Sequence, residues 1–140
     1  PIDLNDEKKI IDILLNLTKQ SLITSAHDIS DGGLLPAICE KLFLNSLGSN
    51  INLPKSLSKM NDFNHQLHGW CFGEDQGRVI ISTKNKEKVI NILRSKSIDH
   101  FILGETNKSG ILNLNDMTTI SIIDIKSNSE KTIPLLMGEK

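Results

Sequence analysis

Residues 25–34 read SAHDISDGGL, and this stretch says most about how the chain of 140 residues is organised. It lies where a predicted strand, residues 22–25, passes into a predicted helix. The Gly32-Gly33 pair allows the main chain to turn sharply and to approach another group without interference from a Cβ atom. The beginning of the helix then offers free N–H groups and the positive end of a dipole, which together suit a phosphate group.

The residues of this stretch leave two interpretations open. Asp28 and Asp31 could bind Mg²⁺, which prefers a few carboxylates beside the phosphates of a ligand. Alternatively, Ser30 or Asp31 caps the helix by accepting a bond from one of its first amides, and the glycines complete the turn. His27 belongs either to a binding site or to the protein interior, as a partly buried imidazole bonded to the main chain.

A second candidate cluster follows in residues 70–78, which read WCFGEDQGR. Four polar side chains stand close together in it: Glu74, Asp75, Gln76 and Arg78. They precede the β-branched run 79–81, which predicts a strand buried on both faces. Polar groups at the end of a strand, with glycines on both sides, are typical of a ligand-binding edge. Arg78 could hold a phosphate or carboxylate through two bonds, or could pair with Glu74 at the surface.

The remaining elements follow from the spacing of apolar residues. Helices are predicted over residues 5–20, after Gly33, and over about 85–96. Strands are predicted at residues 49–53, 79–81, 101–103, 111–114 and 118–122. Residues 54–69 are polar and irregular and predict a surface loop or a short covering segment. Residues 123–137 predict a helix that stops near Pro134. Helices and strands mix without strict alternation, which favours an α+β fold, a layered α/β sandwich with a mixed sheet.

Composition excludes several classes of protein. With 16 basic and 17 acidic residues the net charge is −1, which argues against a nucleic-acid-binding protein. No apolar run approaches the roughly 18 residues of a membrane span. Cys39 and Cys71 do not form a disulfide framework, and we expect a cytoplasmic protein. The histidines and cysteines lack the spacing of a zinc site, Cys71 has no neighbouring base, and no phosphate-loop signature occurs. The residues therefore assign no metal site and no catalytic group.

Taken together, the two clusters resemble the last domain of the phosphoribosylformylglycinamidine synthases. The likeness rests on residues 25–34, about 40 intervening residues, and then residues 72–79. The wider superfamily includes aminoimidazole ribonucleotide synthetase, thiamine monophosphate kinase, selenophosphate synthetase and a hydrogenase maturation protein. Within it, the Phe-Gly-Glu-x-Gln-x-Arg element at residues 72–78 is most similar to the purine enzyme.

The resemblance implies that residues 1–140 are a single domain, the C-terminal fragment of a larger multidomain ligase. Such ligases convert formylglycinamide ribonucleotide to the amidine with ATP, Mg²⁺ and glutamine-derived ammonia, in purine biosynthesis. The implied fold is that of the C-terminal domain of aminoimidazole ribonucleotide synthetase. The implied partners are the preceding ATP-binding domains of the same chain, a glutaminase subunit and a small accessory subunit. The isolated fragment is expected to be inactive.

The resemblance also implies which residues line a substrate or nucleotide cleft. These residues are His27, Asp28, Asp31, Gly32, Gly33, Glu74, Asp75, Gln76 and Arg78. Residues 74–76 match a Glu-Ser-Gln-like element that contacts the ribonucleotide in the first half of such enzymes, but Asp75 stands where Ser is expected. Direct contact with a ligand and a scaffold role therefore both remain open. Two other functions also remain: a non-catalytic assembly module that packs through an apolar face, and a related ATP-dependent enzyme such as thiamine monophosphate kinase.

Overall fold

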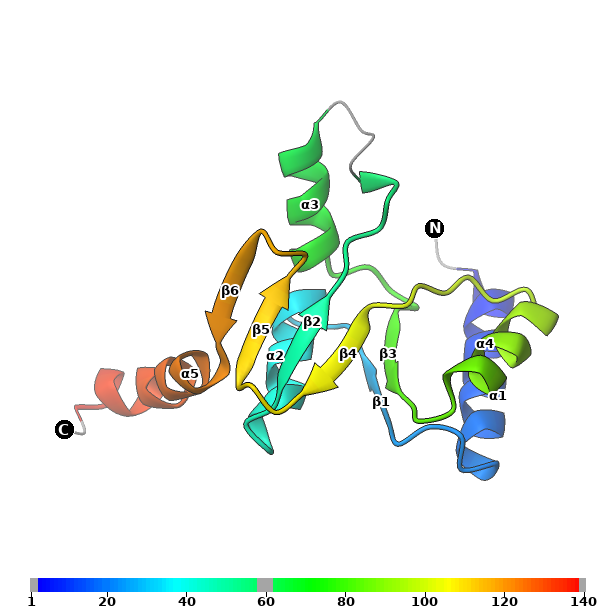
Figure 1. The fold of residues 1–140 in the computed structure, drawn as a ribbon, viewed down its shortest axis with the longest axis horizontal. Coiled ribbons are helices and arrows are strands. Elements are labelled where there is room, and N and C mark those ends of the chain that lie inside the picture. Colours follow the sequence, from blue (N-terminus) through cyan, green and yellow to red (C-terminus); the bar gives the residue numbers. More distant parts are fainter. Residues whose placement is uncertain (1–2, 58–61, 139–140) are drawn as a thin grey trace. The chain divides into compact units, whose positions relative to one another are not determined.

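The computed structural model of the chain describes residues 3–57 and 62–138. In this part of the chain, helices and strands are interspersed, and Figure 1 labels them. The helices are α1 (Leu4–Lys19), α2 (Leu34–Phe43), α3 (Phe63–Phe72), α4 (Lys86–Ser95) and α5 (Ile122–Leu136). The strands are β1 (Ser25–Asp28), β2 (Gly48–Ile51), β3 (Val79–Ser82), β4 (Gly104–Asn107), β5 (Ile111–Leu114) and β6 (Thr118–Ser121).

The chain forms two compact units, each made of two separate segments. The first unit comprises Pro1–Ala37 and Trp70–Phe101, and the second comprises Ile38–Gly69 and Ile102–Lys140. Helices α2 and α3 each contain residues of both units. Both candidate clusters, residues 25–34 and 70–78, therefore belong to the first unit.

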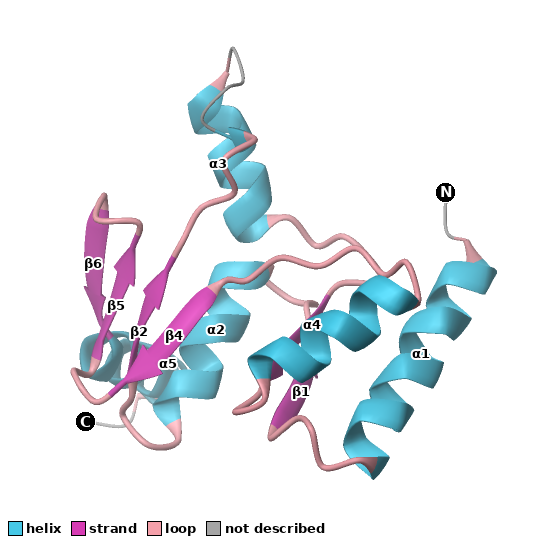
Figure 2. Cartoon of the chain, turned by 45° about the vertical axis from the view of Figure 1, so that its right-hand side comes forward, coloured by secondary structure: helices cyan, strands magenta, loops and turns pink. Residues whose placement is uncertain are grey.

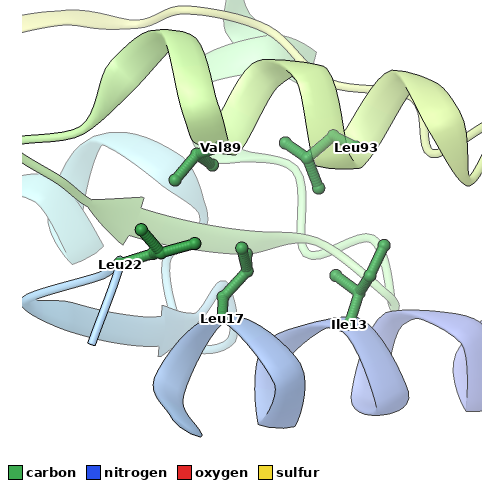
Figure 3. Close-up of a cluster of buried hydrophobic side chains, with 5 residues drawn as sticks. All are labelled: Ile13, Leu17, Leu22, Val89 and Leu93. Carbon is green, nitrogen blue, oxygen red and sulfur yellow. The ribbon is translucent and has the colours of Figure 1, made fainter. Parts of the chain in front are cut away.

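The core of the first unit lies between α1 and α4, which run side by side in Figure 2. Figure 3 shows Ile13 and Leu17 of α1 facing Val89 and Leu93 of α4, with Leu22 beside them. Leu17 is fully buried. The four helical residues recur at i and i+4, so they occupy one face of each helix. Burying a leucine of this kind contributes about 1.5–3 kcal/mol.

Strands β1 and β3 form a two-stranded antiparallel sheet in the first unit. His27 lies opposite Ile80, and Asp28 lies opposite Val79. The ladder continues beyond the strands, because the Ile29 N–H donates to the carbonyl of Arg78 at 2.9 Å. This pairing joins the two candidate clusters, since each strand is directly connected to one of them.

The second unit contains a four-stranded mixed sheet with the order β4-β2-β5-β6. The β2 strand pairs with β4 in antiparallel and with β5 in parallel register, and β5 pairs with β6 in antiparallel register. One face is buried through Ile51 of β2 and Leu112 and Leu114 of β5, which alternate with more exposed neighbours as expected for a half-buried sheet. The buried hydroxyl of Ser49 donates to the carbonyl of Glu105 at 3.0 Å, so it keeps a partner.

The structure confirms the α+β class and the mixed sheet, and most predicted elements. Helix α1, helix α4 with its buried Val89, Ile90 and Leu93, and strand β5 lie where the apolar spacing places them. The C-terminal helix is also present, although it begins at Ile122 and includes Pro134. Ser121 caps it by accepting a bond from the Asp124 N–H at 3.3 Å.

Four sequence expectations were wrong. The strand expected at 22–25 is β1 at Ser25–Asp28, because Leu22 packs into the α1–α4 core instead. The strand expected at 101–103 is β4 at Gly104–Asn107. Strand β3 is not buried on both faces: Ile80 alone of its four residues is buried. It pairs on one side with β1 in the described part of the chain.

The fourth error concerns residues 54–69, which were expected to form a loop. Within this range, residues 58–61 lie outside the described residues, and Phe63 onward forms helix α3. Its apolar residues follow helical spacing, since Phe63, Leu67 and Cys71 stand four apart. The residues between them include two histidines, an asparagine and a glutamine. These polar residues obscured the helical spacing of the apolar ones in the sequence. None of the helices that the structure describes is long and apolar enough to cross a membrane.

Candidate functional site

The glycine turn, residues 29–33, connects β1 to α2 in the first unit. Gly32 and Gly33 have φ angles of +77° and +82°, in the left-handed region that residues with a Cβ atom rarely adopt. The turn is closed by a bond of 3.0 Å from the Gly33 N–H to the carbonyl of Ser30. Two consecutive left-handed residues explain why the sequence has two glycines at this point.

Gly33 is also the point where the glycine turn lies closest to the other cluster. A Cβ atom built on Gly33 would lie 2.5 Å from the carbonyl carbon of Phe72 and 2.7 Å from its Cα. Both neighbours are main-chain atoms, so no side-chain rotation could make room. Gly33 therefore allows the beginning of α2 and the end of α3 to touch main chain to main chain.

The acidic loop, residues 73–77, connects α3 to β3 and is bonded to the glycine turn. The Gly32 N–H donates to the Glu74 carboxylate Oε1 at 2.8 Å. The Gly32 amide lies two residues before the first residue of α2, so Glu74 fixes the turn and does not cap the helix. The contact joins residues 42 positions apart, and no local pattern in the sequence indicates it.

Arg78 directly follows the acidic loop, and its side chain bonds back to the loop and to the end of α3. Its Nη1 donates to the carbonyl of Gly73 at 3.2 Å, and its Nη2 donates to the carbonyl of Trp70 at 3.3 Å. It also pairs with the Asp75 carboxylate at 3.4 Å, so the pairing with Glu74 considered from the sequence does not occur. Carbonyls in the last turn of a helix have no partner within the helix, and a cation there also interacts favourably with the helix dipole.

The predicted site residues differ in accessibility. Asp28, Asp31, Asp75 and Gln76 are exposed, whereas His27 is half-buried on β1. The structure brings Glu74 to Gly32 and Arg78 to Asp75. Within residues 3–57 and 62–138, neither Asp28 nor Asp31 is hydrogen-bonded to the acidic loop. A small pocket in the second unit contains none of the predicted residues; it is lined by Leu53, Pro54, Lys55, Phe63 and Asn115.

The two cysteines and the possible metal ligands complete the chemistry of the described residues. Burial raises the pKa of the Cys71 thiol, and it does the same for Cys39 with a smaller contribution from Glu40. A protonated thiol is a poor nucleophile, which agrees with the expectation that Cys71 is not catalytic. Among residues 3–57 and 62–138, no three or more His, Cys, Asp or Glu side chains are grouped so that they could hold a metal ion.

Several curated relatives of this chain are named phosphoribosylformylglycinamidine synthase subunit PurL. The protein of Carboxydothermus hydrogenoformans is 37% identical over 109 residues, which are 76% of this chain and 14% of that protein. The protein of Methylocella silvestris is 31% identical over 141 residues, which are 99% of this chain and 18% of that protein. The chain thus spans less than a fifth of the length of these relatives.

Solved structures show the same fold. Thermotoga maritima PurL complexed with FGAR superposes with a TM-score of 0.69 at 20% identity, covering 85% of this chain and 20% of that one. The complex of the same protein with ATP gives 0.67 at 18% identity, covering 83% and 21%. The model of the family described as AIR synthase related protein, C-terminal domain, matches residues 1–116. The chain therefore belongs to the family of AIR synthase related proteins, as a C-terminal domain of that family.

Proposed function

We propose that the chain is the C-terminal domain of a phosphoribosylformylglycinamidine synthase. The observation that carries this proposal is the match to a PurL subunit over 99% of the chain. The match extends beyond the region that the family model covers, which ends at residue 116, and includes α5. Two more PurL relatives, at 29% and 28% identity, match 98% of the chain. The proposal therefore assigns the chain to one enzyme, the synthase, and not merely to the superfamily of AIR synthase related proteins.

The whole enzyme in this proposal is an ATP-dependent carbon–nitrogen ligase. ATP activates the amide oxygen of formylglycinamide ribonucleotide, ammonia from glutamine then attacks the amide carbon, and ADP, phosphate and the amidine are released. The T. maritima structures support binding of these ligands by a relative, because one is a complex with FGAR and another a complex with ATP. Another is titled as PurLQS, which supports a glutaminase and a small accessory subunit as partners.

The domain takes part in this reaction through its glycine turn and acidic loop. We place Asp31, Gly32 and Gly33 beside a nucleotide or substrate phosphate, with the acidic loop, residues 73–77, opposite. Magnesium in the whole enzyme would be held mainly by the nucleotide phosphates and by other domains, because the described residues form no metal cage of their own. Most of the catalytic groups would likewise lie outside these 140 residues, and the isolated chain should be inactive.

An assay of the longest reading frame that contains this sequence tests the proposal. The product should convert formylglycinamide ribonucleotide in the presence of ATP and ammonia, whereas the 140-residue chain alone should not. A matched control is the same frame carrying Arg94→Gln, at an exposed residue of α4 outside both clusters, which should keep full activity. A long product that ignores this substrate and phosphorylates thiamine monophosphate would overturn the purine assignment and leave the superfamily in place.

A specific observation also favours an assembly role for the domain. Leu4, Ile11 and Leu15 of α1 are 79%, 56% and 53% exposed. They stand seven and four positions apart, so they form one stripe on the helix face opposite the core residues Ile13 and Leu17. We propose that this stripe packs against the rest of the same polypeptide, because relatives of this chain carry more than four-fifths of their length outside the matched part.

Substitution of the stripe distinguishes this assembly role. The double variant Ile11→Ser and Leu15→Ser should lower the melting temperature or yield of the long product, because its interface loses apolar contacts. The same change should leave the 140-residue chain as stable as before, since both side chains are exposed there. Lys8→Ser, on an exposed residue of the same helix, is the control. Equal effects of the double variant on both chains would contradict the assignment.

A further inference from the structure

The acidic loop is held in place by hydrogen bonds from the side chain of Arg78. The two terminal nitrogens of this guanidinium donate to the main-chain carbonyls of Trp70 and Gly73, which lie on either side of the point where α3 ends. The side chain of Arg78 is 25% exposed, so these bonds are shielded from water. Because both terminal nitrogens of Arg78 donate to main-chain carbonyls, the guanidinium fixes the path of the loop.

The ion pair with Asp75 is the weaker of the Arg78 contacts. Its N–O distance is 3.4 Å, and the Asp75 side chain is 77% exposed. Exposed ion pairs contribute little to stability, because water screens them and both side chains lose freedom. The carbonyl contacts therefore determine where Arg78 lies, and Asp75 is left accessible at the tip of the loop.

Glu74 restrains the same loop through a separate contact. Its carboxylate accepts the Gly32 N–H at 2.8 Å, which ties the acidic loop to the glycine turn. The close approach of Gly33 to the main chain of Phe72 restrains the same two segments. Residues 74–77 of the loop are all exposed. Among the described residues, the side chains of Glu74 and Arg78 bond to main-chain atoms, whereas those of Asp75 and Gln76 do not.

We propose that Arg78 and Glu74 are positioning residues: they hold the acidic loop against the glycine turn, and Asp75 and Gln76 are the residues that meet the ligand. Arg78 is then no anion ligand, although its residue type and place in the sequence suggested one. The inference rests on the proposed function, because the ligand is the nucleotide or ribonucleotide of that reaction. It concerns the described residues of the first unit alone.

Steady-state kinetics of the long product with Arg78→Gln, Glu74→Gln and the double variant test this proposal. Each single variant should raise KM for ATP or for formylglycinamide ribonucleotide about tenfold and leave kcat within about twofold, because a misplaced loop weakens binding of substrate and transition state alike. The double variant should be no worse than the worse single variant, since both act through one loop. Arg94→Gln, at the other arginine of the chain, which is exposed on α4, is the matched control.

Hydrogen exchange supplies a second readout that does not depend on activity. The amide of Gly32 should exchange at least about tenfold faster in both single variants, because each loosens the bond to Glu74. Arg78→Lys is a milder change in case Arg78→Gln does not fold, and it should restore less than half of the lost affinity, because one ammonium cannot match the fork of a guanidinium. Additive kinetic effects with unchanged Gly32 exchange would overturn the proposal and make Arg78 a ligand.

The two proposals can fail separately. A long product without synthase activity but with faster Gly32 exchange in both variants would reject the enzyme assignment and retain the positioning role. If the long product is active, and its Arg78→Lys variant binds substrate as tightly as the unchanged protein, the enzyme assignment stands and the positioning role is rejected. A point charge would then be sufficient at this position.

Discussion

Replacing Gly33 by alanine tests the central contact of the candidate site, between the beginning of α2 and the end of α3. The new Cβ atom would lie 2.5 Å from the carbonyl carbon of Phe72, 2.7 Å from its Cα and 2.8 Å from its oxygen. Ordinary contacts of a Cβ atom are 3.4–4 Å, so the main chain would have to move by roughly 1 Å. The φ angle of +82° adds the strain of a left-handed L-residue.

The expected loss of stability follows from three contributions. The left-handed conformation costs about 1–2 kcal/mol in an alanine. Overpacking against main-chain atoms costs about 1–3 kcal/mol. Displacement of the turn would also weaken the bond between Gly32 and Glu74, which is worth about 1 kcal/mol. The free energy of unfolding should therefore fall by about 3–6 kcal/mol, a large share of the total stability of a domain.

Urea denaturation followed by tryptophan fluorescence measures this loss. Trp70 is the only tryptophan of the chain, and it lies in the last turn of α3 with its ring edge-on to Phe101 at 6.4 Å. Gly69→Ala is the control, because Gly69 lies in the same helix with open space around its Cβ position. That variant should be more stable by about 0.5–1 kcal/mol, since alanine favours the helix.

A milder variant keeps the experiment informative if Gly33→Ala does not fold. At Gly32 the nearest atom to a new Cβ is the Cγ of Pro36 at 3.0 Å, which can yield slightly. The loss for Gly32→Ala should therefore be about 1–2 kcal/mol, mainly from the left-handed φ of +77°. If Gly33→Ala cost less than about 1 kcal/mol, or no more than Gly32→Ala, the main-chain contact with Phe72 would be refuted.

Two further predictions concern the core and a buried thiol. Leu17→Ala should lower the free energy of unfolding by about 2–5 kcal/mol, because Leu17 is fully buried, whereas the half-exposed Leu15→Ala should cost under about 1 kcal/mol in the isolated chain; urea titration checks both. The Cys71 thiol should react with a disulfide reagent at least about tenfold more slowly in the native than in the unfolded chain at the same pH. Burial raises the pKa of Cys71 above the ordinary 9.0, so its contribution to stability is complete below that pH and is lost as pH rises above it. If the stability of the chain relative to its Cys71→Ala variant increased between about pH 9 and 10, this sign would be contradicted.

Local spacing was sufficient for the elements with strong periodicity. Helix α4 was predicted within a residue of its bounds, because Val89, Ile90 and Leu93 form an unmistakable apolar face. The glycine pair at residues 32–33 was also interpreted correctly as a sharp turn before a helix, since both φ angles are positive. Spacing failed for α3, because its apolar residues are separated by polar ones. It also failed for β1, because the apolar Leu22 packs into the core between α1 and α4 and does not belong to the strand.

The candidate site divides in the same way. The sequence alone identified the two segments of the site, because glycines and polar side chains that are close together in the sequence can be recognised without the structure. Tertiary structure decided the roles within them, because a hydrogen bond depends on which groups meet in space and not on their distance along the chain. Glu74 bonds to Gly32 across 42 positions, and Arg78 turns inward to the carbonyls of Trp70 and Gly73. Residue types predicted charged ligand-binding groups there, and these contacts are the reason for our proposal that the two groups support the loop instead.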